Sequence, residues 1–171
     1  ALGAFAWGAL VERNRFTVRR ETVPVLDPAA RPITVLHLSD LHMAPWQTAK
    51  QDWVGSLTDY EPDLVVVTGD SLGHVRGLDG LECALEPFRG VAGVFVHGSN
   101  DYFGPAPKNP FGYFRKDGRE QSEAVHLETD RLEEFFTSLG GLDLNNTARA
   151  MTINGSRLEF VGVNDAHRNW D

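Results

Sequence analysis

The chain has 171 residues, of which 42% are apolar, and its 16 Lys and Arg against 24 Asp and Glu give a formal net charge of -8. This length suits one domain with a substantial core, and the acidic charge argues against a nucleic-acid scaffold, because nucleic acids are held first through neutralised phosphates. The single cysteine, Cys83, can form neither an internal disulfide nor a thiolate metal site, and we expect it to be a small core residue.

The first 30 residues differ in character from the rest. Residues 1–11 are uncharged and apolar, and arginines follow at positions 13, 15, 19 and 20. A bilayer span takes about 20 apolar residues, so this stretch is too short to cross alone. It is either the end of a longer membrane anchor, which clustered arginines at the cytoplasmic face would suit, or an amphipathic segment that packs on the domain. We expect a membrane-associated protein at the cytoplasmic face, with a soluble cytoplasmic protein as the alternative.

Strand-like and helix-like segments alternate from residue 31 onward. The apolar runs Ile33–Leu38, Leu64–Thr68 and Val91–His97 have strand length, and the stretches Trp46–Tyr60 and Leu78–Phe88 between them have helical spacing. Repeats of this kind at intervals of about thirty residues build βαβ units around a parallel sheet. We therefore predict an α/β fold with a parallel βαβαβ front half.

The pattern changes after the third predicted strand. The stretch Tyr102–His126 is rich in Pro, Gly and aromatic residues, and a loop of this length is usually functional; its part up to Phe114 could cover a site or touch lipid headgroups. A helix is predicted over Asp130–Leu139, ended by glycines. The runs Ala148–Ile153 and Arg157–Val163 are joined through Asn-Gly, the strongest short hairpin signal, so the chain passes into antiparallel pairing.

Polar residues follow the three predicted parallel strands. Because ligands in open α/β sheets bind beyond the carboxyl ends of the strands, Asp40, Asp70 and Asn100 are expected to share one rim. His42 lies two residues after Asp40, so in extended geometry both side chains project to the same side and can hold one cation. Oxygen ligands with histidine suit Mn, Fe, Zn or Mg. Taken singly, Asp-x-His often arises by chance, Gly-Asp after a strand is more often a plain turn, and Gly-Ser-Asn-Asp is a good loop or helix cap. Their joint position at the ends of consecutive strands favours a metal site.

These residues resemble the calcineurin-like metallophosphoesterases, whose pattern is Asp-x-His, Gly-Asp, Gly-Asn-His-(Asp/Glu), then His, then Gly-His-x-His. The matching runs are Leu36-His37-Leu38-Ser39-Asp40-Leu41-His42 and Val66-Val67-Thr68-Gly69-Asp70, and Gly162-Val163-Asn164-Asp165-Ala166-His167 is similar to the membrane-associated branch. The resemblance implies a layered sandwich fold and two divalent or trivalent ions. It further implies that Asp40 and His42 bind the first ion, that Asp70 bridges, and that an asparagine of the third motif binds the second.

The third motif departs from the family pattern, since it is Gly98-Ser99-Asn100-Asp101. Either Asn100 is the metal ligand after a shift of one residue, which we favour, or Ser99 replaces the ligand and Asn100 replaces the catalytic histidine. In both alignments the usual general acid is missing. Asp101 is the remaining candidate for this role, although it would need a raised pKa beside cations that normally lower it. His74 and His97, near the rim, are candidates for contact with phosphate.

The later histidine ligands of the family have no counterpart in these 171 residues, because the histidines downstream of the third motif, His126 and His167, lie in no Gly-His-x-His motif. We therefore expect residues 31–171 to be the N-terminal part of the domain and to bind metal weakly and turn over little alone. For the whole protein we expect metal-dependent hydrolysis of a phosphoester, in which activated water attacks phosphorus. The alternative is a non-catalytic domain that holds a ligand or partner, and a membrane surface is a further possible partner.

Overall fold

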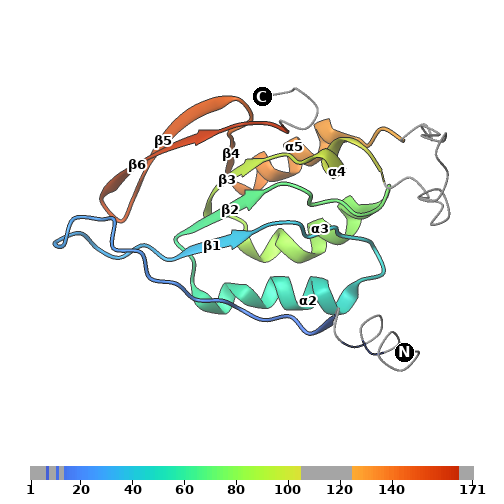
Figure 1. Cartoon of the computed structure of the whole chain (residues 1–171), viewed down its shortest axis with the longest axis horizontal. Helices are drawn as coiled ribbons and strands as arrows, with labels where there is room; N and C mark the ends of the chain where they lie inside the picture. The colour runs from blue at the N-terminus through green and yellow to red at the C-terminus, as the bar shows by residue number, and fades with distance from the viewer. Residues whose placement is uncertain (1–6, 8–10, 12–13, 105–124, 166–171) are drawn as a thin grey trace, which may run out of the picture.

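A parallel four-stranded sheet forms the centre of the computed structural model, which describes residues 7, 11, 14–104 and 125–165 (Figure 1). The strands lie in chain order, β1 (Val35–Leu38), β2 (Leu64–Thr68), β3 (Ala92–Val96) and β4 (Gly141–Asp143). This confirms the predicted α/β fold and its parallel front half, and all four carboxyl ends lie along one edge. The fourth strand was not predicted, because three residues carry too little periodicity to register as a strand.

Three helices form a layer on one face of this sheet. They are α2 (Thr48–Ser56), which continues into the 3₁₀ turn η2 (Leu57–Tyr60), α3 (Gly77–Leu85), which continues into η3 (Glu86–Phe88), and α5 (Thr129–Leu139). The buried residues of α5 recur at helical spacing, and its Phe136 stacks on Phe95 of β3 with ring centroids 4.8 Å apart. Burial of such side chains contributes about 1.5 to 3 kcal/mol each, which holds the layer to the sheet.

One expectation about this layer was wrong. Cys83 of α3 is exposed, since Leu78, Leu81 and Leu85 occupy the buried side of that helix.

The third motif begins the short helix α4 (Ser99–Tyr102), with Gly98 as its N-cap, so its interpretation as a helix cap is confirmed. This helix lies beyond β3 and carries two of the residues singled out from the sequence, Asn100 and Asp101.

The predicted antiparallel hairpin is confirmed as β5 (Thr147–Ile153) and β6 (Ser156–Gly162), a separate two-stranded sheet. Asn154 and Gly155 both have positive φ, 51° and 85°, as a two-residue hairpin turn requires. Gly162 lies so close to the parallel sheet that a Cβ there would be 2.9 Å from Val96 Cγ1. The hairpin therefore packs at the end of β3 rather than standing free.

The described part of the N-terminal segment lies against α2 and the turn that follows it. Phe16 stacks on Trp53 at 4.9 Å between centroids, and the Arg20 guanidinium lies 4.7 Å from the centroid of the Tyr60 ring. Among the residues that the structure describes, none of the helices combines the length and the apolar composition that crossing a bilayer requires. Most of the predicted apolar stretch 1–11, the covering segment 105–114 and His167 lie outside the described residues.

Candidate metal centre

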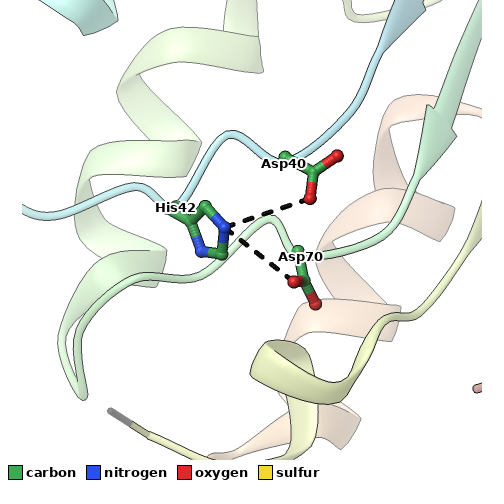
Figure 2. A group of neighbouring side chains, drawn as sticks. All are labelled: Asp40, His42 and Asp70. Atoms are coloured by element: carbon green, nitrogen blue, oxygen red, sulfur yellow. Dashed lines mark ion pairs between the residues drawn. The ribbon is translucent and has the colours of Figure 1, made fainter. Parts of the chain in front are cut away.

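Three of the predicted ligands converge beyond the carboxyl ends of β1 and β2 (Figure 2). His42 Nε2 lies 4.0 Å from Asp40 Oδ1 and 3.8 Å from Asp70 Oδ2, and one ligand atom from each residue lies within 4.8 Å of the others. Two ligands of one cation with bonds of about 2.1 Å are separated by roughly 3 to 4.2 Å. The spacing of His42 from both carboxylates therefore fits shared coordination of a single cation.

The backbone brings these residues together by continuing the parallel pairing past the strands. The N–H groups of Asp40, His42 and Met43 donate to the carbonyl oxygens of Gly69, Asp70 and Ser71 at 3.1, 2.9 and 2.8 Å. Each of the three candidate ligands has a positive φ, 53° at Asp40, 41° at His42 and 52° at Asp70. Such conformations cost about 1 to 3 kcal/mol each for non-glycine residues and persist where the surroundings enforce them. The strain falls on the three residues whose side chains meet.

Glycine at position 98 allows the loop after β3 to approach this site. A Cβ on Gly98 would collide with Asp70 Oδ1 and lie 2.7 Å from the Asp70 amide nitrogen. Gly69 faces it with φ of 86°, and a Cβ there would be 2.6 Å from the Gly98 nitrogen. Only residues without side chains fit at both positions, so the loops after β2 and β3 pack with their backbones in contact.

Asn100 binds the same carboxylate from the first turn of α4. Its backbone N–H donates to Asp70 Oδ1 at 3.0 Å, and its Nδ2 donates to Asp70 Oδ2 at 2.7 Å. A half-turn of the terminal amide exchanges nitrogen and oxygen, which have nearly the same shape. The Asn100 amide oxygen would then lie beside Asp70 Oδ2, and both oxygens could bind the same cation.

Asp101 has a different environment from the one its predicted role requires. Its side chain is 0% exposed; Oδ1 accepts from the N–H groups of Ser71 and Leu72 at 2.8 and 3.0 Å, and Oδ2 accepts from Gly98 at 3.0 Å. Burial raises the pKa of Asp101 to about 6, outweighing these donors, which lower it. Both carboxylate oxygens accept hydrogen bonds and neither is exposed to solvent. The Asp101 side chain therefore joins the loops after β2 and β3 and is not placed to protonate a leaving group.

Neither candidate for phosphate contact belongs to the convergent group. His74 packs edge-on against Trp46, with centroids 4.8 Å apart, and its Nδ1 accepts from the N–H of Arg76. His97 is 5% exposed and lies between the rings of Phe95 and Tyr102. His97 follows Phe95 by two residues and so faces the helical layer as Phe95 does, away from the rim.

The burial of His97 makes stability depend on pH. Desolvation lowers the pKa of His97, while the nearby Asp143 carboxylate raises it in part. The unfolded chain therefore takes up a proton at higher pH than the folded chain, and stability present above about pH 6.5 is lost as the pH falls through the lower folded value. In urea unfolding between about pH 7 and about pH 5, we expect wild type to lose more stability than His97→Gln. Parallel pH profiles of the two proteins would contradict this.

The donor set itself suits a divalent cation. Asp40, His42 and Asp70 provide two carboxylates and one imidazole, and His42 remains 46% exposed, so a cation could enter from solvent. Without a cation, the two carboxylates repel each other, whereas both would be attracted to a cation bound between them. Within the described ranges, no other set of three or more His, Cys, Asp and Glu side chains comes as close together. The three residues therefore fit a metal, with oxygen and nitrogen ligands typical of Mn, Fe, Zn or Mg.

Comparison with known proteins extends these observations. Residues 33–169 match the family model described as calcineurin-like phosphoesterase. The chain is also similar to a Bacillus subtilis (strain 168) protein named uncharacterized metallophosphoesterase YkoQ, with 30% identity over 98 residues. That alignment covers 53% of this chain and 36% of the relative, so the match spans little more than a third of that protein.

Proposed function

Since the chain belongs to the calcineurin-like phosphoesterase family, we propose that it supplies Asp40, His42, Asp70 and Asn100 to a two-metal centre that hydrolyses a phosphoester. One observation supports this most strongly. The three side chains that lie together at the rim belong to residues whose backbones have positive φ, a strained conformation for residues other than glycine. Strain of this kind is kept where function requires a geometry.

Each residue has a separate part in the proposed site. Asp40 and His42 would hold the first ion, and Asp70 would be shared with the second, because its Oδ2 faces both His42 Nε2 and the Asn100 amide. After the half-turn of its amide, Asn100 would offer its oxygen to the second ion from α4. Bound divalent cations would polarise the phosphoryl oxygens, stabilise the charge of in-line attack and lower the pKa of the attacking water.

Among the residues that the structure describes, none beside the proposed site is evident as a proton donor for the leaving group. Asn100 is an amide that does not titrate, and the carboxyl of Asp101 is enclosed by backbone donors. We therefore propose that substrates with acidic leaving groups react best, because such groups depart without protonation.

Contact with a membrane surface and location at its cytoplasmic face stay part of this proposal.

Metal removal tests the proposal. The protein is isolated from its native source, its intact mass is recorded, and Mn²⁺ binding and hydrolysis of bis(p-nitrophenyl) phosphate are measured before and after dialysis against EDTA. We expect EDTA to abolish hydrolysis and Mn²⁺ to restore it, because the carboxylates and His42 alone do not activate water at neutral pH. Hydrolysis that is indifferent to EDTA would contradict the proposal.

A non-catalytic role is the second candidate, and the missing proton donor is the observation that favours it. The same experiment separates the two. Saturable Mn²⁺ binding that is lost in the Asp40→Asn variant, with no turnover of either a phosphodiester or a phosphomonoester, would mean that the domain binds a ligand or partner without cleaving it. Turnover that requires Asp40 would establish the hydrolase.

A further inference from the structure

Trp46 is a large aromatic side chain that lies exposed close to the candidate metal centre. It follows His42 by four residues, so the two Cα atoms are at most about 14 Å apart, and Trp46 is 63% exposed. Single apolar side chains on a surface are common, whereas a rigidly held aromatic within a larger apolar patch indicates a binding site. How Trp46 is held and what adjoins it therefore decide whether it has a role.

The turn before Trp46 is fixed by side-chain hydrogen bonds. Gln51 of α2, 8% exposed, donates through Nε2 to the carbonyl oxygens of Ala44 and Pro45 at 3.1 and 3.2 Å. Gln47 Oε1 accepts from the Ala44 N–H at 2.9 Å. A buried amide costs free energy unless it is hydrogen-bonded, and the Gln51 amide makes its bonds to the two residues before Trp46. The backbone that carries this ring is therefore preorganised, so binding a ligand would cost it little conformational freedom.

The loop after β2 holds the ring of Trp46 itself. The His74 ring packs against it edge-on, with centroids 4.8 Å apart and planes at 70°, and the Arg76 N–H donates to His74 Nδ1 at 3.1 Å. The Gly73 N–H donates to the Met43 carbonyl oxygen at 2.9 Å, which extends the ladder that also positions the candidate ligands. Trp46 is therefore fixed relative to the metal centre, although most of its surface remains open to solvent.

Exposed apolar surface continues from this pair of rings. Val75, next to His74 in the chain, is 53% exposed, and Val125 is 60% exposed. Both border Gly104, since its N–H donates to the Val125 carbonyl oxygen at 2.8 Å and a Cβ on it would lie 3.3 Å from Val75 Cγ1. Apolar surface shared by several neighbouring residues marks a site of interaction. We call this surface the Trp46 patch, and its members are Trp46, His74, Val75 and Val125.

The place of the Trp46 patch beside the candidate ligands identifies what it would contact. A phosphoester whose phosphoryl oxygens face metal ions directs its organic groups away from them, toward the surrounding surface. We propose that Trp46 determines substrate specificity by stacking on an aromatic group carried by the phosphoester, an inference that rests on the proposed function. An aromatic leaving group also suits a site without an evident proton donor among the described residues, because phenols are far more acidic than alkyl alcohols.

Calorimetry of ligand binding to the Mn²⁺-loaded protein tests this inference without any turnover. Phenylphosphonate, cyclohexylphosphonate and methylphosphonate offer the ions the same phosphoryl oxygens and differ in the organic group. We expect wild type to bind phenylphosphonate about tenfold more tightly than methylphosphonate, and also more tightly than cyclohexylphosphonate, because only the phenyl ring can stack on the indole. Trp46→Ala should remove this preference without changing the affinity for methylphosphonate, and Trp46→Phe should keep most of it.

Val25→Ala is the control, because Val25 is 78% exposed in the segment before β1 and also loses apolar surface. The inference would be overturned if wild type showed no preference for phenylphosphonate, or if the preference survived Trp46→Ala or was lost in Val25→Ala. Weaker binding of methylphosphonate by Trp46→Ala would overturn it too, since Trp46 would then act on the fold of the site. Each of these results leaves the proposed function standing, whereas Mn²⁺ binding without binding of any phosphonate would contradict the proposed function as well.

Discussion

Asp70→Asn is expected to lower Mn²⁺-dependent hydrolysis by about 10²-fold or more and to weaken Mn²⁺ binding measured by calorimetry. Loss of a partner outside the coordination sphere typically costs 10- to 100-fold in affinity or activity, and the proposed bridging ligand should cost at least as much. The substitution removes one anionic oxygen facing His42 Nε2 at 3.8 Å. Asparagine tolerates the φ of 52° at this position and keeps an acceptor for the Asn100 N–H, so the fold should survive.

Asp79→Asn is the matched control for this variant. Asp79 is exposed on α3, so the same change in charge there leaves the rim intact. Circular dichroism and urea unfolding should show both variants folded. If Asp70→Asn keeps wild-type Mn²⁺ affinity, or if Asp79→Asn loses as much, the residue is not the ligand that we propose.

Asp101→Ala is expected to lower the free energy of unfolding by about 3 to 5 kcal/mol in urea titrations of the metal-free protein. The reason is that three backbone N–H groups, at Ser71, Leu72 and Gly98, would lose their acceptor in a closed environment, and each unsatisfied buried donor costs about 1 to 3 kcal/mol. Asp101→Asn should lose less, because its amide oxygen can still accept from Ser71 and Leu72. The loops it joins carry Asp70 and Asn100, so Mn²⁺ affinity should fall in both variants.

Two comparisons make the Asp101 result interpretable. Asp52→Ala, at an exposed position of α2, should change stability by less than about 0.5 kcal/mol. If Asp101→Ala costs under about 1 kcal/mol, the carboxyl does not hold the loops together. If Asp101→Asn matches wild type in both stability and Mn²⁺ affinity, the three N–H groups do not need an anionic acceptor. The amide nitrogen of the asparagine would then be accommodated beside the Gly98 N–H.

Much of the fold could be predicted because its signals are local and repeated. The runs Leu64–Val67 and Val94–Val96 are apolar and form strands, and the Asn-Gly pair at the hairpin has one favoured geometry. β4 was missed because a three-residue strand depends on pairing with β3, a contact between distant parts of the chain. The exposure of Cys83, by contrast, could have been predicted, since Leu78, Leu81 and Leu85 mark the opposite side of α3.

The candidate site was predicted in part, for a related reason. Asp40, His42 and Asp70 could be placed at one rim from strand order alone, and the structure brings them together. The environment of Asp101 could not be predicted, because its partners are backbone N–H groups, which every sequence contains. The position of His97 follows from strand alternation with Phe95, once the packing of Phe95 on α5 is known.

The ladder of hydrogen bonds that continues from β1 and β2 into the ligand loops makes the rim part of the same cooperative unit as the sheet. The candidate ligands Asp40 and Asp70 follow paired strands at neighbouring hydrogen bonds, so their separation is set by the spacing of the strands and not by an independent loop. Selection for tight packing beneath β1 and β2 is therefore also selection on ligand geometry, and an apolar substitution in the core can alter metal affinity without touching the rim.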